Sequence, residues 1–367
     1  MWNVGLSGSP SIESLLGRGI MDVGRGDHAA YLGEAIVLVT GAGGSIGSEL
    51  CARLAGLGPR ELVLVDQAEA PLVGITRVLH QDLGFTRCTP VLADLKIRTR
   101  ALQLLDRYRP DVVIHAAAYK HVPLLEEYPV EGVATNVLGT KNLLEASRST
   151  GVGRFVLFSS DKAVAPASVL GRTKRVAEWL VADTGRGSDG RYAVVRLGNV
   201  IDSSGSIVPI FRRQVADGGP LTVTDSRATR YLMTADEAAG LAIAAGALAD
   251  SESVFFLDTG PPVPVVDLAR RVAATAARPV EVQLIGLRPG ERLHEYMFWP
   301  GDDVVVTPCD NVLRVPLHRV EPSWLNGWLA MLARYVEQAS AAGVRATLLQ
   351  MEQIPELSEA RPTRVTA

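Results

Sequence analysis

The chain has 367 residues, 47% of them apolar, and a formal net charge of −3. A chain of this length can bury one large core or two modest ones, and its mild acidity excludes a broad basic face for nucleic acid. Its three cysteines are far apart and form neither a disulfide framework nor a metal-ligand cluster. The longest apolar run, 238–249, is far shorter than the roughly 20 residues that span a bilayer, and residues 1–20 show no basic-then-apolar leader. We expect a soluble cytoplasmic protein without a bound metal and without a membrane span.

Predicted strands and helices alternate along the first half of the chain. The expected strands, in order, are 35–40, 61–65, 90–92, 111–115, 154–158 and 192–197. Helical patterns fill the intervals, among them 97–108 and 129–150. This alternation is typical of an α/β fold, and it predicts a Rossmann-like, doubly wound parallel sheet with helices on both faces.

The sequence TGAGGSIG (40–47) joins the first predicted strand to a helix. Gly41 permits a tight turn, Gly44 lets the backbone approach a pyrophosphate, and Gly47 allows the helix to pack closely on the strand. The N-terminus of the helix then offers free N–H groups and a positive dipole end to phosphates. We therefore predict that a dinucleotide binds at Gly41, Gly44, Ser45, Ile46 and Gly47.

The ends of the next two strands add carboxylates to this predicted site. Asp66 ends the strand at 61–65, where a carboxylate hydrogen-bonds a ribose 2′-hydroxyl and repels a 2′-phosphate. The cofactor is therefore predicted to be NAD rather than NADP. Asp94 and Leu95 follow the strand at 90–92, with Asp94 placed to contact an adenine edge. The alternative is an ordinary α/β loop in which Asp66 caps a helix.

The strand at 111–115 is followed by small side chains that would let a cofactor lie close to the backbone, although close packing alone explains them equally well. These residues are Ala116, Ala117 and Ala118. Lys120 and His121 come next, at the strand end where ligands bind in such sheets. We predict that Lys120 contacts cofactor and substrate, and that His121 contacts substrate.

The strand at 154–158 ends in a run of hydroxyl and ionisable groups. Ser160, Asp161 and Lys162 at the carboxyl end of a buried strand are costly unless they bind or react. Adjacent Asp and Lys side chains also shift each other's proton affinity. We predict that these three residues are catalytic, the alternative being a solvated loop with a helix cap. Lys174 follows on a predicted helix at 169–180, one turn after Leu170.

Several stretches of the chain, in this order, resemble one known family. They are TGAGGSIGSEL, HAAAYKHVPLLEEYP, TNVLGT, FVLFSSDKAVAP, RLGNVI, SSGSIVPIF, GGPLTVT, TRYLMT and RPGERLHE. The chain resembles the extended short-chain dehydrogenases/reductases and, more narrowly, the polysaccharide-biosynthesis family of UDP-N-acetylglucosamine 4,6-dehydratases. Residues 12–18 resemble the linker of its membrane-anchored members, and we interpret this chain as a soluble form of that branch.

The resemblance implies an internal redox elimination on a UDP-linked amino sugar. A hydride leaves sugar carbon 4 for NAD, Lys162 removes the carbon 5 proton, Asp161 protonates the departing 6-hydroxyl, and the hydride returns to carbon 6. The reverse assignment of Asp161 and Lys162 stays open. The resemblance also implies that Lys174 is part of the catalytic set and hydrogen-bonds the nicotinamide ribose, and that the protein forms a homo-oligomer.

One position departs from the wider superfamily. Most short-chain dehydrogenases have a Tyr base four residues before the lysine, and this chain has Leu170 there, where the membrane-anchored branch is similar in having Met. The role of the Tyr would pass to another group, such as a water held by Ser160 or Asp161. Two alternative functions therefore stay open: a nucleotide-sugar 4-epimerase, and a catalytically silent NAD-binding partner subunit.

Substrate contacts are expected further along the chain. Arg230 and Arg288 are candidates for a diphosphate because a guanidinium offers forked donors, although each alone is as readily a surface charge. Asn199 follows a predicted strand, and Glu291 is placed to accept from a ribose hydroxyl.

After Gly198 the alternation becomes irregular, with short predicted strands at 221–223, 254–257 and 280–285. This pattern predicts a smaller mixed α/β C-terminal lobe that binds substrate. The expected units are an extension at 1–33, an NAD-binding domain at 34–200, a substrate lobe at 201–342 from which the chain can cross back to the sheet, and a tail at 343–367. We expect residues 1–30 and the tail to be irregular and mobile.

Overall fold

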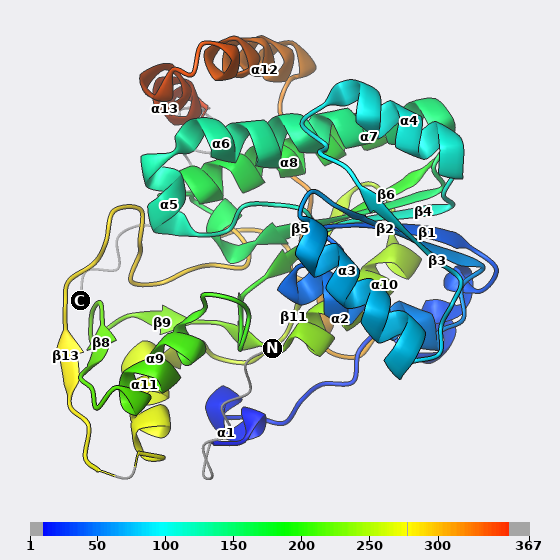
Figure 1. Ribbon diagram of the computed structural model, residues 1–367. Coiled ribbons are helices and arrows are strands. Elements are labelled where there is room, and N and C mark those ends of the chain that lie inside the picture. The colour runs from blue at the N-terminus through cyan, green and yellow to red at the C-terminus, as the bar shows by residue number, and fades with distance from the viewer. Residues whose placement is uncertain (1–9, 277, 352–367) are drawn as a thin grey trace.

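The computed structural model describes residues 10–276 and 278–351, and its centre is a nine-stranded sheet (Figure 1). The strand order is β14–β15–β11–β6–β5–β4–β1–β2–β3. The strands from β3 to β11 in this order run parallel, β15 pairs antiparallel with β11, and β14 pairs antiparallel with β15. Their bounds are β1 Ile36–Thr40, β2 Glu61–Asp66, β3 Cys88–Leu92, β4 Val112–His115, β5 Arg154–Ser160, β6 Arg191–Leu197, β11 Ser253–Leu257, β14 Val305–Val306 and β15 Val312–Pro316.

Helices cover both faces of the sheet, which confirms the predicted doubly wound α/β architecture (Figure 1). One face packs under α4 Arg98–Tyr108, α5 Val122–Glu127, α6 Pro129–Val133, α7 Thr140–Thr150 and α8 Val169–Gly185, with α12 Pro322–Glu337 and α13 Ala341–Gln350 outside α6 and α8. The other packs against α2 Ser45–Gly56, α3 Glu69–Arg77 and α10 Ala235–Leu248. The strands between these layers are continuous apolar runs because both of their faces are buried.

The predicted helix at 129–150 is one helical stretch with a widened middle. It begins at Pro129, passes through a π-helical turn over Ala134–Gly139, and ends before Gly151, whose φ of 74° closes the helix. Within the wide turn, Asn136 accepts from Tyr119 N–H and donates to Tyr119 C=O. The turn therefore fixes the loop that leaves the end of β4.

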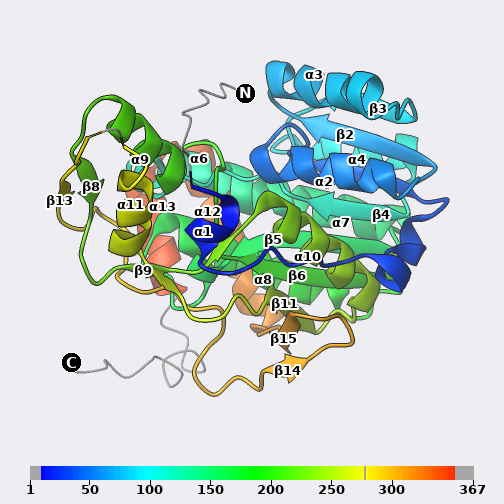
Figure 2. The ribbon, with the colours of Figure 1, turned by 90° about the horizontal axis from the view of Figure 1, so that it is seen from below.

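A smaller lobe stands at one end of the sheet, around its own core (Figure 2). It comprises α9 Ile207–Ala216, β8 Leu221–Val223, β9 Thr229–Arg230, β12 Val263–Pro264, α11 Val265–Ala273 and β13 Val282–Leu284. The short pair of β7 Asn199–Val200 and β10 Leu232–Met233 lies between the lobe and β6.

The chain crosses back to the sheet through α10 and β11, a return that the prediction allowed. Strand β11 lies beside β6 rather than in the lobe, because SVFFL is apolar on both of its faces. Val254 and Phe256 enter one core, and Phe255 and Leu257 enter the other. Only a central position in the sheet buries both sets at once.

The expectation that both ends are irregular is wrong for three described stretches, the helices at Ile12–Leu16, Gly26–Leu32 and Ala341–Gln350, and the expected mobility stays a prediction. Helix α1 (Ile12–Leu16) inserts Leu15 and Leu16 into the core of the small lobe. The guanidinium of Arg18 then forms an ion pair with the buried Glu237 of α10. At the other end α13 buries Val344 and Leu348. The expectations for residues 1–9 and 352–367 lie outside the described residues.

No helix in the described ranges is long and apolar enough to cross a membrane.

Candidate functional site

The glycine-rich turn lies between the carboxyl end of β1 and the start of α2. A Cβ on Gly41, whose φ is +64°, would lie 2.8 Å from the backbone of Ala117, and one on Gly47 would lie 2.0 Å from the carbonyl oxygen of Gly41. Both positions therefore require glycine. The N-cap of α2 is Gly44, which has no side chain to occupy the N–H groups of the first turn.

Asp66 closes this turn from the end of β2. One carboxylate oxygen accepts from Gly43 N–H at 3.0 Å, and the other accepts from Ala68 N–H at 2.9 Å. The carboxylate is therefore held at the rim of the pocket with lone pairs still available, since each oxygen can accept more than one hydrogen bond.

A pocket at the ends of β1, β2, β3 and β4 brings most of the predicted cofactor residues together. Its lining includes Gly41, Gly44, Asp66, Asp94, Leu95, Ala116, Ala117 and Ala118. Ser45, Ile46 and Gly47 lie next to it in the first turn of α2. Lys120 and His121 follow the pocket on the exposed loop before α5, where the His121 ring packs on Gly205.

His115, which the sequence did not single out, also lines this pocket. The Thr140 hydroxyl donates to the Asn136 carbonyl and therefore accepts from His115 Nε2 at 2.9 Å, while His115 Nδ1 faces the Thr40 hydroxyl at 2.6 Å. Burial, with the nearby charge of Lys174, lowers the pKa of His115 to about 3. The imidazole is therefore neutral, and it joins β1, β4 and α7 beneath the pocket.

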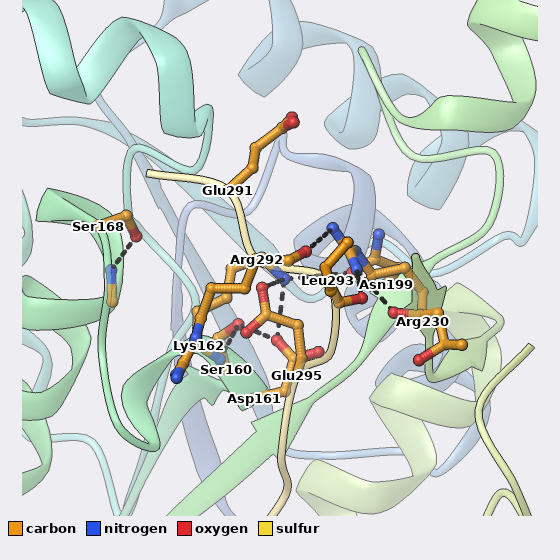
Figure 3. Close-up of polar contacts among 12 residues, drawn as sticks. Ser160, Asp161, Lys162, Ser168, Asn199, Arg230, Glu291, Arg292, Leu293 and Glu295 are labelled. Carbon is orange, nitrogen blue, oxygen red and sulfur yellow. Dashed lines mark hydrogen bonds and ion pairs between the residues drawn. The ribbon is translucent and has the colours of Figure 1, made fainter. Parts of the chain in front are cut away.

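The predicted catalytic run lies at the carboxyl end of β5. Ser160 is the last residue of the strand, and Asp161 and Lys162 begin a short 3-10 helix. Asp161 Oδ1 accepts from the Ser160 hydroxyl at 2.8 Å and from Lys162 Nζ at 3.0 Å (Figure 3). Asp161 is fully buried, and its Oδ2 has no hydrogen-bond partner among the described residues.

Glu295 completes a charged cluster with this pair, and the sequence analysis missed it. Its Oε1 lies 3.7 Å from Lys162 Nζ, and only 6% of the residue is exposed. Burial lowers the pKa of Lys162, but Asp161 and Glu295 outweigh burial and raise it overall. Burial, with Asp161, raises the pKa of Glu295 against the opposing charges of Lys162, Arg230 and Arg292. The sequence could have pointed to Glu295, because it is the last residue of RPGERLHE, one of the stretches that resemble the family.

Asn199 joins the same cluster, whereas Glu291 does not. Asn199 Oδ1 accepts from Lys162 Nζ at 3.2 Å. Glu291 pairs with the exposed Arg288, whose Nε donates to it at 2.9 Å, and Figure 3 shows Glu291 directed away from the cluster. The structure therefore brings Asn199, but neither Arg288 nor Glu291, to the catalytic run.

Arg230 lies beside the cluster, and both terminal nitrogens of its guanidinium donate to backbone carbonyls. Its guanidinium donates to the backbone carbonyls of Thr229 at 2.7 Å, Arg292 at 2.9 Å and Leu293 at 3.0 Å. In this arrangement Arg230 fastens the segment that carries Glu295. Diphosphate binding by Arg230 stays a prediction.

Helix α8 carries Lys174 and Leu170 as predicted, one turn apart. Both are buried, and Leu170 is part of the apolar core. Lys174 Nζ donates to the carbonyl of Phe158 on β5 at 2.7 Å. Burial lowers the pKa of Lys174 to about 8, against the opposing charge of Glu178.

A second charged group, centred on Glu178 of α8, lies against β5. Glu178 accepts from the Ser159 hydroxyl at 2.7 Å, from Arg196 at 2.9 and 2.8 Å, and from Arg175 at 3.0 Å. Arg196 also donates to the Met297 carbonyl at 2.8 Å. This network joins β5, β6 and α8 to the segment after Glu295.

Comparison with known proteins places this site in context. The family model described as polysaccharide biosynthesis protein matches residues 37–316. The chain is 43% identical over 287 residues to the probable polysaccharide biosynthesis protein EpsC of Bacillus subtilis (strain 168), which covers 77% of this chain and 48% of that protein. The chain thus spans about half the length of this relative.

Two further similar proteins have names that state a reaction. The chain is 33% identical over 205 residues to a UDP-N-acetylglucosamine 4,6-dehydratase (inverting) of Campylobacter jejuni subsp. jejuni serotype O:2, covering 55% of this chain and 60% of that one. The structure of a Thermus thermophilus UDP-glucose 4-epimerase in complex with NAD superposes with a TM-score of 0.62 at 25% identity, covering 72% of this chain and 90% of that one.

Proposed function

The chain belongs to the polysaccharide biosynthesis protein family, and we propose that it is an NAD-dependent 4,6-dehydratase acting on UDP-N-acetylglucosamine. The observation that carries the proposal is the ion pair between the buried Asp161 and the partly buried Lys162 at the carboxyl end of β5. An elimination needs one group that accepts a proton from carbon 5 and one that donates a proton to the 6-hydroxyl. An epimerisation at carbon 4 needs no donor at that hydroxyl.

The pocket beside this pair fits a dinucleotide. Gly41 and Gly47 exclude any Cβ from the turn, and the first turn of α2 presents N–H groups where a pyrophosphate would bind. The Asp66 carboxylate would accept from ribose hydroxyls and disfavour a 2′-phosphate, which supports NAD over NADP. NAD supplies reversible hydride chemistry when bound, and Lys174 would donate to its nicotinamide ribose.

The charges of the cluster favour one of the two proton assignments that the sequence left open. Because Asp161 and Glu295 raise the pKa of Lys162, the ammonium form holds its proton at neutral pH. Asp161 accepts hydrogen bonds from that ammonium and from the Ser160 hydroxyl, as a carboxylate does. This arrangement supports Asp161 as the acceptor of the carbon 5 proton and Lys162 as the donor to the 6-hydroxyl, rather than the reverse.

Leu170 cannot take the proton of the 4-hydroxyl, because its side chain is apolar and packed in the core. The groups available at the end of β5 are Ser160 and Asp161, whose Oδ2 is unpartnered among the described residues. A water held between them would pass this proton to solvent, from which Lys162 regains the proton that it gives to the 6-hydroxyl. This route would let the enzyme act without the usual Tyr.

The test is turnover of UDP-N-acetylglucosamine with NAD in deuterated water, followed by mass spectrometry and NMR. Loss of one water with deuterium at carbon 5 is the expected result. A carbon 4 epimer without water loss would replace the dehydratase by an epimerase. Inertness toward UDP-linked sugars would leave a silent NAD-binding subunit.

Asp161→Asn tests the proton assignment in the same assay. We expect it to abolish deuterium exchange at carbon 5, because an amide cannot accept that proton. Exchange that survives while elimination stops would instead make Asp161 the donor to the 6-hydroxyl. Asp189→Asn, in the exposed loop before β6, is the matched control and should behave like the parent protein.

A further inference from the structure

Among the described residues Lys162 lies near three side-chain oxygens, and the one from the most distant part of the chain belongs to Glu295. Its Nζ is 3.0 Å from Asp161 Oδ1, 3.2 Å from Asn199 Oδ1 and 3.7 Å from Glu295 Oε1. Asp161 is the neighbour of Lys162 in sequence, and Asn199 begins β7 directly after β6. Glu295 comes from the irregular segment that follows the small lobe (Figure 3).

We propose that Glu295 is a positioning residue of the active site: it is the second carboxylate that fixes Lys162 in place and keeps its amine charged. The inference rests on the proposed function only in that Lys162 takes part in the reaction. Asp161 provides the first carboxylate from inside the catalytic run, and Glu295 closes the cluster from the other side.

The segment that carries Glu295 is fastened on both sides of it. Before it, Arg230 donates to the carbonyls of Arg292 and Leu293, and Arg292 itself donates to the carbonyl of Ala165 in the loop before α8. After it, Arg196 donates to the carbonyl of Met297. A carboxylate held in this way cannot leave the cluster without breaking several backbone hydrogen bonds.

The burial of Glu295 needs an explanation, and Lys162 supplies it. A buried carboxylate is costly unless it is paired, and Lys162 Nζ is the cation that the structure brings within 4 Å of it. The guanidinium of Arg230 is engaged by backbone carbonyls, as is that of Arg292. Glu295 and Lys162 thus neutralise each other inside the protein.

The charges around Lys162 determine how Glu295 affects its pKa. Asp161 and Glu295 raise the pKa of Lys162, while burial and Arg230 lower it. The charges that act on Glu295 are those of Lys162, Asp161, Arg230 and Arg292, and the phenol of Tyr231 lies near Asp161 and Tyr296. If Glu295 loses its charge, only Asp161 still raises the pKa of Lys162, while burial and Arg230 continue to lower it. Lys162 must then release its proton at lower pH.

The chain is well suited to a direct measurement, because it contains only five lysines: Lys96, Lys120, Lys141, Lys162 and Lys174. Protein labelled with ¹³C at lysine Cε gives few NMR signals, and Lys162→Arg assigns the signal of interest. In Glu295→Gln we expect the Lys162 signal to titrate at lower pH than in the parent protein. The same substitution at Glu281, an exposed glutamate before β13, is the control and should leave the titration unmoved.

Turnover supplies the second readout. Glu295→Gln should lower kcat on the order of 10- to 100-fold, because the reacting group loses its fixed position. The limb of the pH–rate profile that belongs to Lys162 should move to lower pH with the NMR titration. Glu295→Asp, which keeps the charge but shortens the reach, should restore part of both properties.

The inference is overturned if folded Glu295→Gln leaves the Lys162 titration at its parental pH. It is also overturned if Glu295→Asp and Glu295→Gln lose activity equally with unshifted pH profiles, since Glu295 would then serve only to pack the segment. The NMR titration requires no turnover. An inactive protein with a shifted Lys162 titration would therefore contradict the proposed dehydratase and leave the role of Glu295 standing.

Discussion

Replacing Glu178 by Gln tests whether the charged network that joins β5, β6 and α8 holds the fold together. The side chain is fully buried and accepts four hydrogen bonds, three of them from the guanidinium groups of Arg175 and Arg196. Gln keeps the shape of the side chain but removes the charge. Two buried guanidinium groups would then lack their counter-charge. Removing one partner of a buried ion pair in this way strongly lowers the free energy of unfolding.

The expected loss follows from the charge of this carboxylate. Burial raises the pKa of Glu178, but Arg196 and Arg175 outweigh burial and lower it from the ordinary 4.5 to about 2. At about 1.4 kcal/mol per pH unit, this difference stabilises the folded protein by roughly 3 kcal/mol. Loss of one partner from a buried ion pair typically costs about 3–5 kcal/mol. We therefore expect Glu178→Gln to lower the free energy of unfolding by roughly 3–5 kcal/mol.

The sign of the pH dependence is also fixed. Because the pKa of Glu178 is lowered on folding, its stabilisation is complete above about pH 4.5 and is lost as the pH falls towards 2. The difference between the parent protein and Glu178→Gln should therefore be largest near neutral pH and shrink below pH 4.5. Urea unfolding followed by tryptophan fluorescence and circular dichroism measures this difference at each pH.

Glu337→Gln, on the exposed side of α12, is the control and should change the unfolding free energy by less than about 0.5 kcal/mol. A loss below about 1 kcal/mol in Glu178→Gln at pH 7 would refute the reasoning. So would a difference from the parent protein that stays constant down to pH 3.

Three further predictions concern the glycine-rich turn, Lys174 of α8 and the N-terminal segment. Gly47→Ala should abolish NAD binding or folding, because the new Cβ would lie 2.0 Å from the carbonyl oxygen of Gly41. Gly56→Ala in the same helix is the control: its Cβ meets nothing within 4 Å, so the substitution should be neutral or stabilising. NAD titration and thermal unfolding compare the two variants. Lys174→Met should weaken NAD binding by about 10-fold or more, measured by calorimetry, and unchanged affinity would remove Lys174 from the cofactor site. Arg18→Ala should lower the free energy of unfolding by about 3 kcal/mol, because the buried carboxylate of Glu237 loses its ion-pair partner. Urea unfolding measures this change, and a midpoint equal to that of the parent protein would show that the ion pair contributes little to stability.

Much of the fold could be predicted because the deciding signals are local. The six expected strands match β1 to β6 to within a few residues, since each is a short apolar run between turn residues. The run of Ser160, Asp161 and Lys162 could be found in the same way, because polar groups directly after a buried strand stand out in the sequence.

Other features depend on contacts between distant parts of the chain, and no local pattern reports them. The prediction allowed the chain to cross back to the sheet without saying where, and β11 is the strand that does so, because its two apolar faces need a core on each side. Residues 12–32 look irregular by themselves, yet Leu15 and Leu16 complete the small-lobe core. An amphipathic segment of this length shows its value only when its partner surface is present.

By itself, the sequence determined the doubly wound sheet, the glycine-rich turn and the placement of Asp161 and Lys162 at the end of β5, because each follows from neighbouring residues. Only the tertiary structure decided that Glu295 meets Lys162 and that the guanidinium of Arg230 is held by backbone carbonyls. The charge state of a buried group depends on every charge within a few ångströms of it. Those neighbours come from remote segments, so the fold has to bring them together before the chemistry of the site can be read.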